Sequence, residues 1–288
     1  MQELYYTQFI AGEHNNTTDC EVVTMRHMLI TGGAGGIGYA VSIYFSQKGW
    51  KVYSCDVASQ VPVDSKIIPV VMDVRSAKSV ATARSLVEKD TDHLDVVINL
   101  AGIYIMDSLV EVPEKDFIRM FDINVTGAYR VNKEFLPLIK NGGRIIIITS
   151  ELSCLKPLPF NGIYSITKST LEAYAHSLRL ELSLIDIPVI TIRPGAVNTK
   201  LLSDSFTSME KMCAKTYLYK TNAIKFHNIM KKVTKKPIPQ GKLASMIYHV
   251  AVASHPRASY TIGAGLGLRI FSMLPSGIQA VILKKLLK

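Results

Sequence analysis

Residues 28–38 read MLITGGAGGIG. A short apolar run ends there in a glycine-rich turn, and an apolar helical pattern follows from Ile37 to Lys48. Glycines let the backbone approach a pyrophosphate closely, and the N-terminus of a helix presents unpaired N–H groups and a positive dipole end to it. This order of strand, turn and helix predicts a dinucleotide-binding unit at the start of an α/β fold.

The glycines of this turn fit two spacing templates at once. Gly33, Gly35 and Gly38 match G-x-G-x-x-G. Gly32, Gly36 and Gly38 match T-G-x-x-x-G-x-G. The spacing therefore does not choose between classes of dinucleotide-binding protein, and a glycine-rich turn without a ligand is the alternative.

An acidic residue at the end of the second apolar run indicates which dinucleotide would bind. The run KVYSCD (51–56) ends at Asp56. A carboxylate in this position can accept hydrogen bonds from the ribose hydroxyls of NAD and would repel the 2′-phosphate of NADP. The glycine turn contains no Lys or Arg that could bind such a phosphate. We therefore favour NAD over NADP, the alternative being that Asp56 only ends an exposed strand.

The rest of the chain alternates between apolar runs and helical patterns. We predict strands at 67–72, 95–99, 144–149 and 188–192, and helices at 76–89, 124–140 and 162–185. Strands rich in Val and Ile between helices indicate a parallel sheet that is covered on both faces. We predict a single doubly wound Rossmann-type α/β domain with a central parallel sheet of about seven strands. Polar residues fall at the predicted carboxyl ends of the strands, where ligands bind such sheets: Gly32, Asp56, Asp73, Asn99, Ser150 and 193–195.

Tyr164 and Lys168 lie four residues apart in the helix predicted over 162–185. This spacing places a phenol and an ammonium on the same helical face. A free Tyr has a pKa of about 10, and an adjacent cation favours the phenolate and lowers that pKa. The pair therefore predicts a proton shuttle that works near neutral pH. Such pairs are common on protein surfaces, so this one gains its weight from the glycine-rich turn that precedes it.

Taken together, these motifs resemble those of the classical short-chain dehydrogenase/reductase family. The matching segments are TGGAGGIG (31–38), Asp73, NLAG (99–102), Asn124, Ser150, YSITK (164–168) and RPGAVNT (193–199). They follow the family order from residue 28 to about residue 200. The resemblance implies an oxidoreductase that interconverts a secondary alcohol and a ketone by hydride transfer.

The resemblance also implies a role for each matched residue. Tyr164 would be the general acid/base, Lys168 would bind the nicotinamide ribose, and Ser150 would polarise the substrate oxygen. Asn124 would interrupt its helix and position a water molecule that links Lys168 to solvent. The implied cofactor contacts are Gly32, Gly36, Ile37, Gly38, Asp56, Asp73, Val74, Asn99, Ala101, Gly102, Tyr164, Lys168, Pro194, Gly195, Val197 and Thr199.

The position of the serine departs from the family pattern. The catalytic Ser usually precedes the Tyr by 13 residues, and Glu151 occupies that position here. Ser150 and Ser153 are the two candidates, and a one-residue insertion in the loop 155–162 favours Ser150, because loops absorb insertions readily. Glu151 either shapes the choice of substrate or points to solvent.

Residues 199–241 follow the predicted nicotinamide-binding turn and are expected to form a lid over the substrate. Their many Met and aromatic residues favour a lipophilic substrate such as a steroid, a retinoid or a long-chain lipid, although an ordinary amphipathic helix would look alike. The tail 269–288 resembles those of lipid-, retinol- and steroid-active members of the family. Its residues Ile278, Val281, Ile282 and Leu286 can form one apolar face among lysines, suited to an anionic membrane, a neighbouring subunit or the chain's own pocket.

Positive charge is concentrated in the same C-terminal region. Residues 200–288 contain 15 Lys/Arg and 2 Asp/Glu, a net charge of +13, whereas residues 1–199 carry −3. This asymmetry predicts an anionic neighbour, which could be a membrane surface or an acidic lipid-like substrate. We expect no nucleic-acid partner, because no recognition motif accompanies the charge.

The remaining features set the expected context of the domain. We divide the chain into an N-terminal extension (1–24), which does not resemble a signal peptide, a catalytic domain (25–268) and the tail (269–288). The four Cys and seven His residues have no metal-ligand or disulfide spacing, so we expect no metal and a cytoplasmic protein with reduced thiols, with contact to a membrane surface left open.

The family resemblance implies a homodimer or homotetramer. Three rivals stay open at this point. They are a nucleotide-sugar epimerase or dehydratase, a non-catalytic NAD-sensing protein, and a membrane-peripheral interaction protein.

Overall fold

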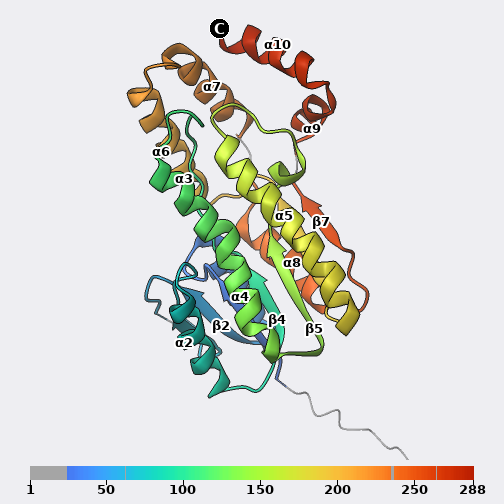
Figure 1. The fold of residues 1–288 in the computed structure, drawn as a ribbon. Helices are drawn as coiled ribbons and strands as arrows, with labels where there is room; N and C mark the ends of the chain where they lie inside the picture. The colour runs from blue at the N-terminus through green and yellow to red at the C-terminus, as the bar shows by residue number, and fades with distance from the viewer. Residues whose placement is uncertain (1–24, 62, 235–236, 264) are drawn as a thin grey trace, which may run out of the picture.

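The computed structural model describes residues 25–61, 63–234, 237–263 and 265–288, so the proposed extension 1–24 lies outside the described residues. Seven parallel strands form one sheet in the order β3-β2-β1-β4-β5-β6-β7 (Figure 1). The strands are β1 (His27–Thr31), β2 (Lys51–Asp56), β3 (Ile67–Val71), β4 (Leu94–Asn99), β5 (Ile139–Ile148), β6 (Val189–Pro194) and β7 (Ser259–Ile262). The prediction of a doubly wound α/β domain is confirmed.

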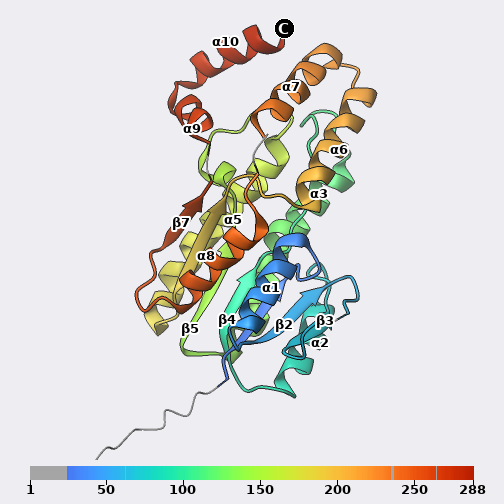
Figure 2. The same ribbon diagram turned by 180° about the vertical axis from the view of Figure 1, so that it is seen from behind.

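Helices cover both faces of this sheet. Helices α1 (Gly36–Gln47) and α8 (Gln240–Val252) lie on one face (Figure 2). Helices α2 (Ala77–Glu88), α4 (Gly127–Phe135) and α5 (Gly162–Leu182) lie on the other (Figure 1). Successive strand residues point to opposite faces, and both faces are buried. The strands therefore read as nearly continuous apolar runs.

The strand order reverses beside β1, and this reversal positions the ligand crevice. From β1 the chain proceeds outward to β2 and β3, and β4 then returns to the other side of β1. Connections that leave in opposite directions open a crevice beyond the carboxyl ends of the two central strands. The glycine-rich turn follows β1 and the NLAG segment follows β4, so both border this crevice.

The helix predicted over 124–140 has different limits in the structure. Helix α3 (Glu114–Phe121) begins after Pro113, with Glu114 and Asp116 in its first turn. It continues through a π-helical segment (Asp122–Thr126) into α4. Acidic residues in a first turn stabilise a helix start. Pro137 lies in a short 3-10 turn after α4, and β5 then begins at Ile139.

Four helices gather at one end of the molecule, beyond the carboxyl ends of the strands (Figures 1 and 2). They are α6 (Lys200–Lys215), α7 (Lys220–Val233), α9 (Leu266–Met273) and α10 (Ser276–Leu287). Helix α10 packs on α7, where the Asn222 side chain donates a hydrogen bond to the Leu287 carbonyl (2.8 Å). The proposed boundary between residues 268 and 269 therefore falls inside α9.

Candidate active site

Tyr164 and Lys168 project from the first turns of α5 beneath a cavity at the carboxyl end of the sheet. Both side chains are buried. The Lys168 Nζ donates a hydrogen bond to the Ile148 carbonyl at the end of β5 (2.9 Å) and lies 5.9 Å from the centre of the Tyr164 ring. The two groups share a helical face, as the spacing predicts.

The ionisation of this pair differs from the prediction made from the sequence. Burial raises the pKa of Tyr164 to about 12, and the nearby Ser150 hydroxyl partly offsets this rise. Burial lowers the pKa of Lys168 to about 8. The predicted lowering of the Tyr164 pKa is thus wrong, because desolvation penalises both charged forms. The phenol is protonated at neutral pH.

Ser150 and Ser153 have separate places. Ser150 directly follows β5 and lines the cavity beside Tyr164. The Ser153 hydroxyl donates to the Ser150 carbonyl (2.7 Å) and to Glu172 Oε2 (3.2 Å). Ser153 therefore supports the turn that carries Ser150, and Ser150 is the serine that lines the cavity.

Asn124 lies in the π-helical segment between α3 and α4, so the helix is interrupted where the family resemblance implies. Its Oδ1 accepts a hydrogen bond from the Ile103 N–H (2.8 Å), and its Nδ2 donates to the Ile103 carbonyl (3.0 Å) and to Thr167 Oγ1 (3.1 Å). The amide therefore fixes the loop after β4 against α5. Such π-helical insertions often occur at functional sites.

The glycine-rich turn is closely packed against the strands and α1. Gly32 has a φ of +73°, and a Cβ there would lie 3.1 Å from the Ala101 Cα after β4. A Cβ on Gly38 would lie 2.8 Å from the Gly33 Cα. Helix α1 has no side-chain cap at Gly35 and no acidic residue in its first turn. Its first N–H groups are therefore available to an anion.

Asp56 lies beside this turn at the end of β2. Its Oδ2 accepts a hydrogen bond from the Ala34 N–H (3.0 Å), and its Oδ1 accepts one from the Ala58 N–H (3.1 Å). Three features thus follow one another along the crevice. They are the Asp56 carboxylate, the start of α1 with its free N–H groups, and the Tyr164–Lys168 pair. These residues fit a nicotinamide dinucleotide that extends from its adenosine ribose to its nicotinamide.

Comparison with known proteins agrees with this geometry. The sequence profile described as short chain dehydrogenase matches residues 26–210, more than half of the 288-residue chain. The chain belongs to the short-chain dehydrogenase family. It is therefore an oxidoreductase that acts on alcohol or carbonyl groups.

Individual relatives of this short-chain dehydrogenase cover most of its length. A probable short-chain type dehydrogenase/reductase, VdlC, from Helicobacter pylori is 29% identical over 86% of this chain and 93% of its own. An NADPH-dependent 1-acyldihydroxyacetone phosphate reductase from Schizosaccharomyces pombe is 32% identical over 64% of each chain. The structure of a 3-ketoacyl-(acyl-carrier-protein) reductase from Brucella melitensis complexed with NADH has a TM-score of 0.66 at 18% identity, covering 83% of this chain and 97% of that one.

The remaining cofactor residues predicted for this short-chain dehydrogenase divide into two groups. Ile37, Gly102, Pro194, Gly195 and Val197 line the cavity. Thr199 caps α6, and its methyl group lies 3.4 Å from where a Cβ on Gly36 would be. The segment after β6 therefore meets the glycine-rich turn across the crevice.

In the second group the side chains are engaged elsewhere. Val74 is buried in the core, and Asn99 donates a hydrogen bond to Asn132 Oδ1 (2.6 Å). Asp73 pairs with Arg75 (2.7 Å), which lowers the pKa of its carboxyl.

The cavity of this short-chain dehydrogenase has a volume of about 620 Å³. The lid (199–241) and the tail (269–288) contribute apolar side chains to its wall, among them Leu202, Phe206, Phe226, Met230, Phe271 and Leu283. Tyr104 and Asn161 also line the cavity, and sequence analysis does not predict them because no motif contains them. Tyr104 stacks on Tyr164, with ring centres 3.9 Å apart and planes at 24°, and Asn161 precedes α5.

Glu151 also lines the cavity, next to Ser150. Its Oε2 accepts a hydrogen bond from the Gly265 N–H at the start of α9 (2.9 Å). Burial raises the pKa of this carboxyl, against the opposing effects of the Gly265 N–H and Arg269. Glu151 therefore ties the C-terminal helices to the active site rather than pointing away into solvent.

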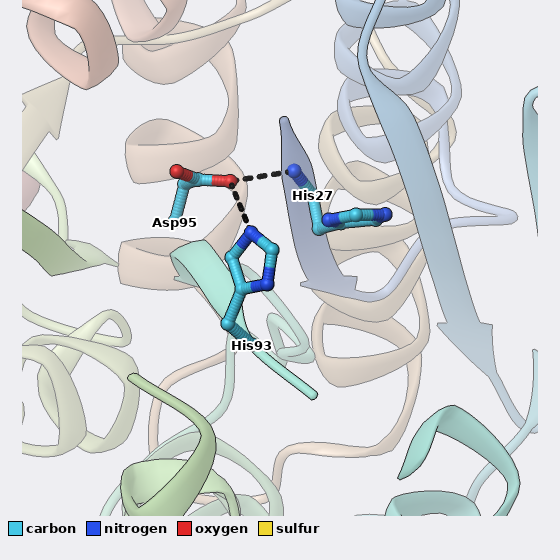
Figure 3. A group of neighbouring side chains, drawn as sticks. All are labelled: His27, His93 and Asp95. Carbon is cyan, nitrogen blue, oxygen red and sulfur yellow. Dashed lines mark hydrogen bonds and ion pairs between the residues drawn. The ribbon is translucent and has the colours of Figure 1, made fainter. Parts of the chain in front are cut away.

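A second group of titratable side chains lies at the amino ends of the central strands β1 and β4, at the opposite end of the sheet from the cavity. His27, His93 and Asp95 place their potential ligand atoms within 4.8 Å of one another, although the sequence spacing gave no such indication. Figure 3 shows that the Asp95 carboxylate meets the backbone nitrogen of His27 rather than its ring. The two rings meet edge to face, and His93 Nδ1 contacts Asp92 (2.8 Å). The Asp95 carboxylate also lies 3.9 Å from His93 Nε2, and together these contacts connect the starts of β1 and β4.

Proposed function

We propose that this protein is an NAD(H)-dependent oxidoreductase that interconverts a secondary alcohol and a ketone on a lipophilic molecule. The observation that carries the proposal is the position of Ser150, Tyr164 and Lys168 at the base of a large, mainly apolar cavity. A panel of hydroxysteroids and long-chain secondary alcohols tests it, with turnover measured from the NADH absorbance. Turnover of none of these classes with either dinucleotide would contradict it.

The three side chains divide the chemistry between them. In ketone reduction the protonated Tyr164 hydroxyl gives its proton to the carbonyl oxygen, and in alcohol oxidation the Tyr164 phenolate takes the proton of the alcohol. Ser150 donates a hydrogen bond to the same oxygen and stabilises the charge that develops there. Lys168, held by the Ile148 carbonyl, places positive charge beside the phenol. A bound nicotinamide supplies or accepts the hydride.

The lining of the cavity supports a lipophilic substrate. Apolar side chains from α6, α7, α9 and α10 form a large part of its wall, and a Met side chain such as Met230 adapts to irregular apolar ligands. The Schizosaccharomyces pombe relative is named as a reductase of an acyl lipid phosphate. Both observations favour a long apolar substrate over a small sugar.

Asp56 supports NAD as the preferred cofactor, although that relative is named as NADPH-dependent. Replacing Asp56 with Ala removes the carboxylate that would repel a 2′-phosphate. We expect the ratio of kcat/KM with NAD to kcat/KM with NADP to fall by roughly 10- to 100-fold. Asp64→Ala, which removes the same charge from the connection between β2 and β3, is the control. An unchanged ratio in Asp56→Ala would show that another residue selects the cofactor.

We also propose that the C-terminal end of the molecule contacts an anionic membrane surface. Its exposed large apolar residues, here called the C-terminal surface, are Tyr217, Leu218, Ile224, Val233, Ile270, Met273, Ile278, Val281 and Leu286. Helices α7, α9 and α10 contain no Asp or Glu, and each carries Lys or Arg in addition to its exposed apolar residues. Apolar groups combined with cations are suited to an anionic lipid interface. No helix among the described ranges is long and apolar enough to cross a membrane.

The cavity opens toward the C-terminal surface. Val233 and Leu286 belong both to this surface and to the cavity lining. Helix α10 buries Leu287 and leaves Ile278 and Val281 exposed, so its apolar residues divide between the lid and the outside. A lipophilic substrate could therefore enter directly from a bilayer.

Charged substitutions on the C-terminal surface test the membrane contact. The double variant Met273→Glu/Val281→Glu is expected to lower binding to phosphatidylserine-containing vesicles by about 10-fold or more. The substitutions place negative charge at the anionic lipid interface and remove apolar contact with the lipid. Leu184→Glu/Ile185→Glu, in the 3-10 turn (Ser183–Ile185) that follows α5, adds the same charge to exposed apolar positions and is expected to bind normally. Equal sedimentation of both variants with vesicles would contradict the proposal.

A homodimer or homotetramer is proposed as well. The outward faces of α4 and α5 expose Tyr129 and Leu180, and apolar residues of this kind favour contact between subunits. Analytical ultracentrifugation tests this part of the proposal independently of activity.

A further inference from the structure

Two imidazoles and a carboxylate come together at the amino ends of β1 and β4 (Figure 3). Met28 pairs with Val96 in the parallel register, so the preceding residues, His27 and Asp95, are neighbours on the two strands. His93 precedes Asp95 by two residues, a spacing that places both side chains on the same side of an extended chain. The potential ligand atoms of His27, His93 and Asp95 all lie within 4.8 Å of one another. The register of the sheet therefore assembles this group from distant parts of the chain.

The neighbours of His93 leave one of its ring nitrogens beside Asp95. His93 Nδ1 lies 2.8 Å from Asp92 Oδ1, and a carboxylate can only accept, so Nδ1 is the donor. In the neutral ring Nε2 then carries the lone pair. This Nε2 lies 3.9 Å from Asp95 Oδ2, which is too far for a hydrogen bond. An imidazole whose other nitrogen donates to a carboxylate is the usual arrangement of a histidine that binds a metal ion.

Packing holds the His27 ring beside the other two groups. The ring stacks on Tyr53 with centres 6.3 Å apart, and it meets the His93 ring edge to face at 4.9 Å. His27 Nδ1 lies 3.4 Å from the Thr91 hydroxyl, a long contact that a metal ion can replace. In the described part of the chain Asp95 forms no ion pair with a Lys or Arg, so no fixed cation balances its carboxylate.

The cations around this group have partners of their own. Lys51 pairs with Asp90 (2.7 Å), and Lys140 pairs with Asp92 (2.5 Å). The Arg144 guanidinium donates to two backbone carbonyls, at 3.1 and 2.7 Å. A metal ion held by the two imidazoles and the carboxylate would therefore leave these contacts in place.

We propose that His27, His93 and Asp95 bind a Zn²⁺ ion. Imidazole nitrogens and carboxylate oxygens are preferred ligands of Zn²⁺, at about 2.0–2.2 Å. Ligand atoms around a tetrahedral ion of this size lie about 3.3 Å apart, so side-chain rotations that bring the three groups about 1 Å closer complete the site. Water takes the fourth position. The His93 and Asp95 side chains are 30% and 34% exposed, so the ion can enter from solvent.

The position of the site gives the ion a structural role. It lies at the opposite end of the sheet from the cavity and joins β1 to β4, the two central strands that border the crevice. Folding brings together ligands that are far apart in the unfolded chain. Zn²⁺ therefore binds the folded state preferentially and stabilises it. This inference goes beyond the proposed function and does not depend on turnover.

Calorimetric titration of the metal-free, untagged full-length protein with Zn²⁺ tests the proposal. His27→Gln and His93→Gln are each expected to weaken Zn²⁺ binding by about 100-fold or more, because each removes an imidazole ligand. Asp92→Asn keeps all three ligands but alters the group that orients His93, and a loss of about 10-fold or more is expected. His176→Gln removes an exposed imidazole from α5 and is the control, with normal Zn²⁺ binding expected.

Thermal unfolding gives a second readout. At a Zn²⁺ concentration about 100-fold above Kd, Tm is expected to rise by about 5 °C in the wild type and in His176→Gln. No rise is expected in His93→Gln. Tm is compared with and without Zn²⁺ within each variant, so a loss of stability caused by the substitution itself does not affect the result.

Co²⁺ in place of Zn²⁺ identifies the ligands. Visible d–d bands are expected without a thiolate-to-cobalt charge-transfer band, since the proposed ligands include no Cys. A thiolate band would place the metal at a cysteine and overturn the proposal. A wild type that binds no Zn²⁺, or equal Zn²⁺ affinity and equal Tm shifts in the wild type and His93→Gln, would also overturn it. None of these results would affect the proposed oxidoreductase activity.

Discussion

Replacing Tyr164 with Phe is expected to lower kcat by roughly 100- to 10,000-fold and to leave NADH affinity nearly unchanged. The substitution removes only the hydroxyl that exchanges a proton with the substrate. The aromatic ring remains to stack on Tyr104, whose centre lies 3.9 Å away, so the cavity keeps its shape. Single-turnover measurements of alcohol oxidation and fluorescence titration with NADH give the two quantities.

A second tyrosine of the same helix is the control for Tyr164→Phe. Tyr174 accepts a hydrogen bond from Asn132 (3.1 Å), far from the cavity. Tyr174→Phe also loses one hydroxyl, and we expect a small loss of stability with normal turnover. Robust activity in Tyr164→Phe would remove the proposed mechanism. NADH binding by a wild type that turns over no alcohol or ketone would favour the rival of a cofactor-sensing protein.

Replacing Gly38 with Ala is expected to weaken NADH binding by about 100-fold or more. The added Cβ would lie 2.8 Å from the Gly33 Cα and closer still to the Gly32 carbonyl oxygen, and both atoms belong to the backbone. The turn and the start of α1 must therefore move apart. This movement displaces the N–H groups that would bind the pyrophosphate. Fluorescence titration with NADH measures the loss, and circular dichroism shows whether the variant is folded.

Gly241→Ala is the matched control for this glycine. A Cβ at Gly241 has no neighbour within 4 Å, and the position lies in the first turn of α8. We expect normal NADH affinity and normal stability there. A folded Gly38→Ala protein with wild-type NADH affinity would mean that the turn does not hold the dinucleotide.

The parts of the site that the sequence predicted are those set by short-range geometry. Tyr164 and Lys168 share a helical face because they are four residues apart, whatever surrounds them. The glycine-rich turn is similar, since its strand, turn and helix are consecutive. The alternation of apolar runs and helices likewise predicted the parallel sheet before any contact was known.

The limits of the helix around Asn124 could not be predicted in the same way. The prediction began at residue 124, although Pro113 and Glu114 signal a start ten residues earlier. The π-helical segment is maintained by the bonds of Asn124 to Ile103 and Thr167, which are distant in the chain. Partners of this kind cannot be read from local spacing.

The pKa of Tyr164 shows a further limit of sequence reasoning. Spacing placed a cation near the phenol, but burial and the direction of the Lys168 side chain decide the outcome. The choice between Ser150 and Ser153 is similar. Only the fold shows that Ser153 turns toward Glu172 while Ser150 faces the cavity.

The sequence by itself determined the family, the parallel sheet, the glycine-rich turn and the pairing of Tyr164 with Lys168. Each depends on residues close together in the chain, where helical or strand periodicity fixes their relative positions. The tertiary structure decided which serine lines the cavity and where Glu151 is anchored. These depend on desolvation and on contacts between distant segments, and both arise only when the chain is packed.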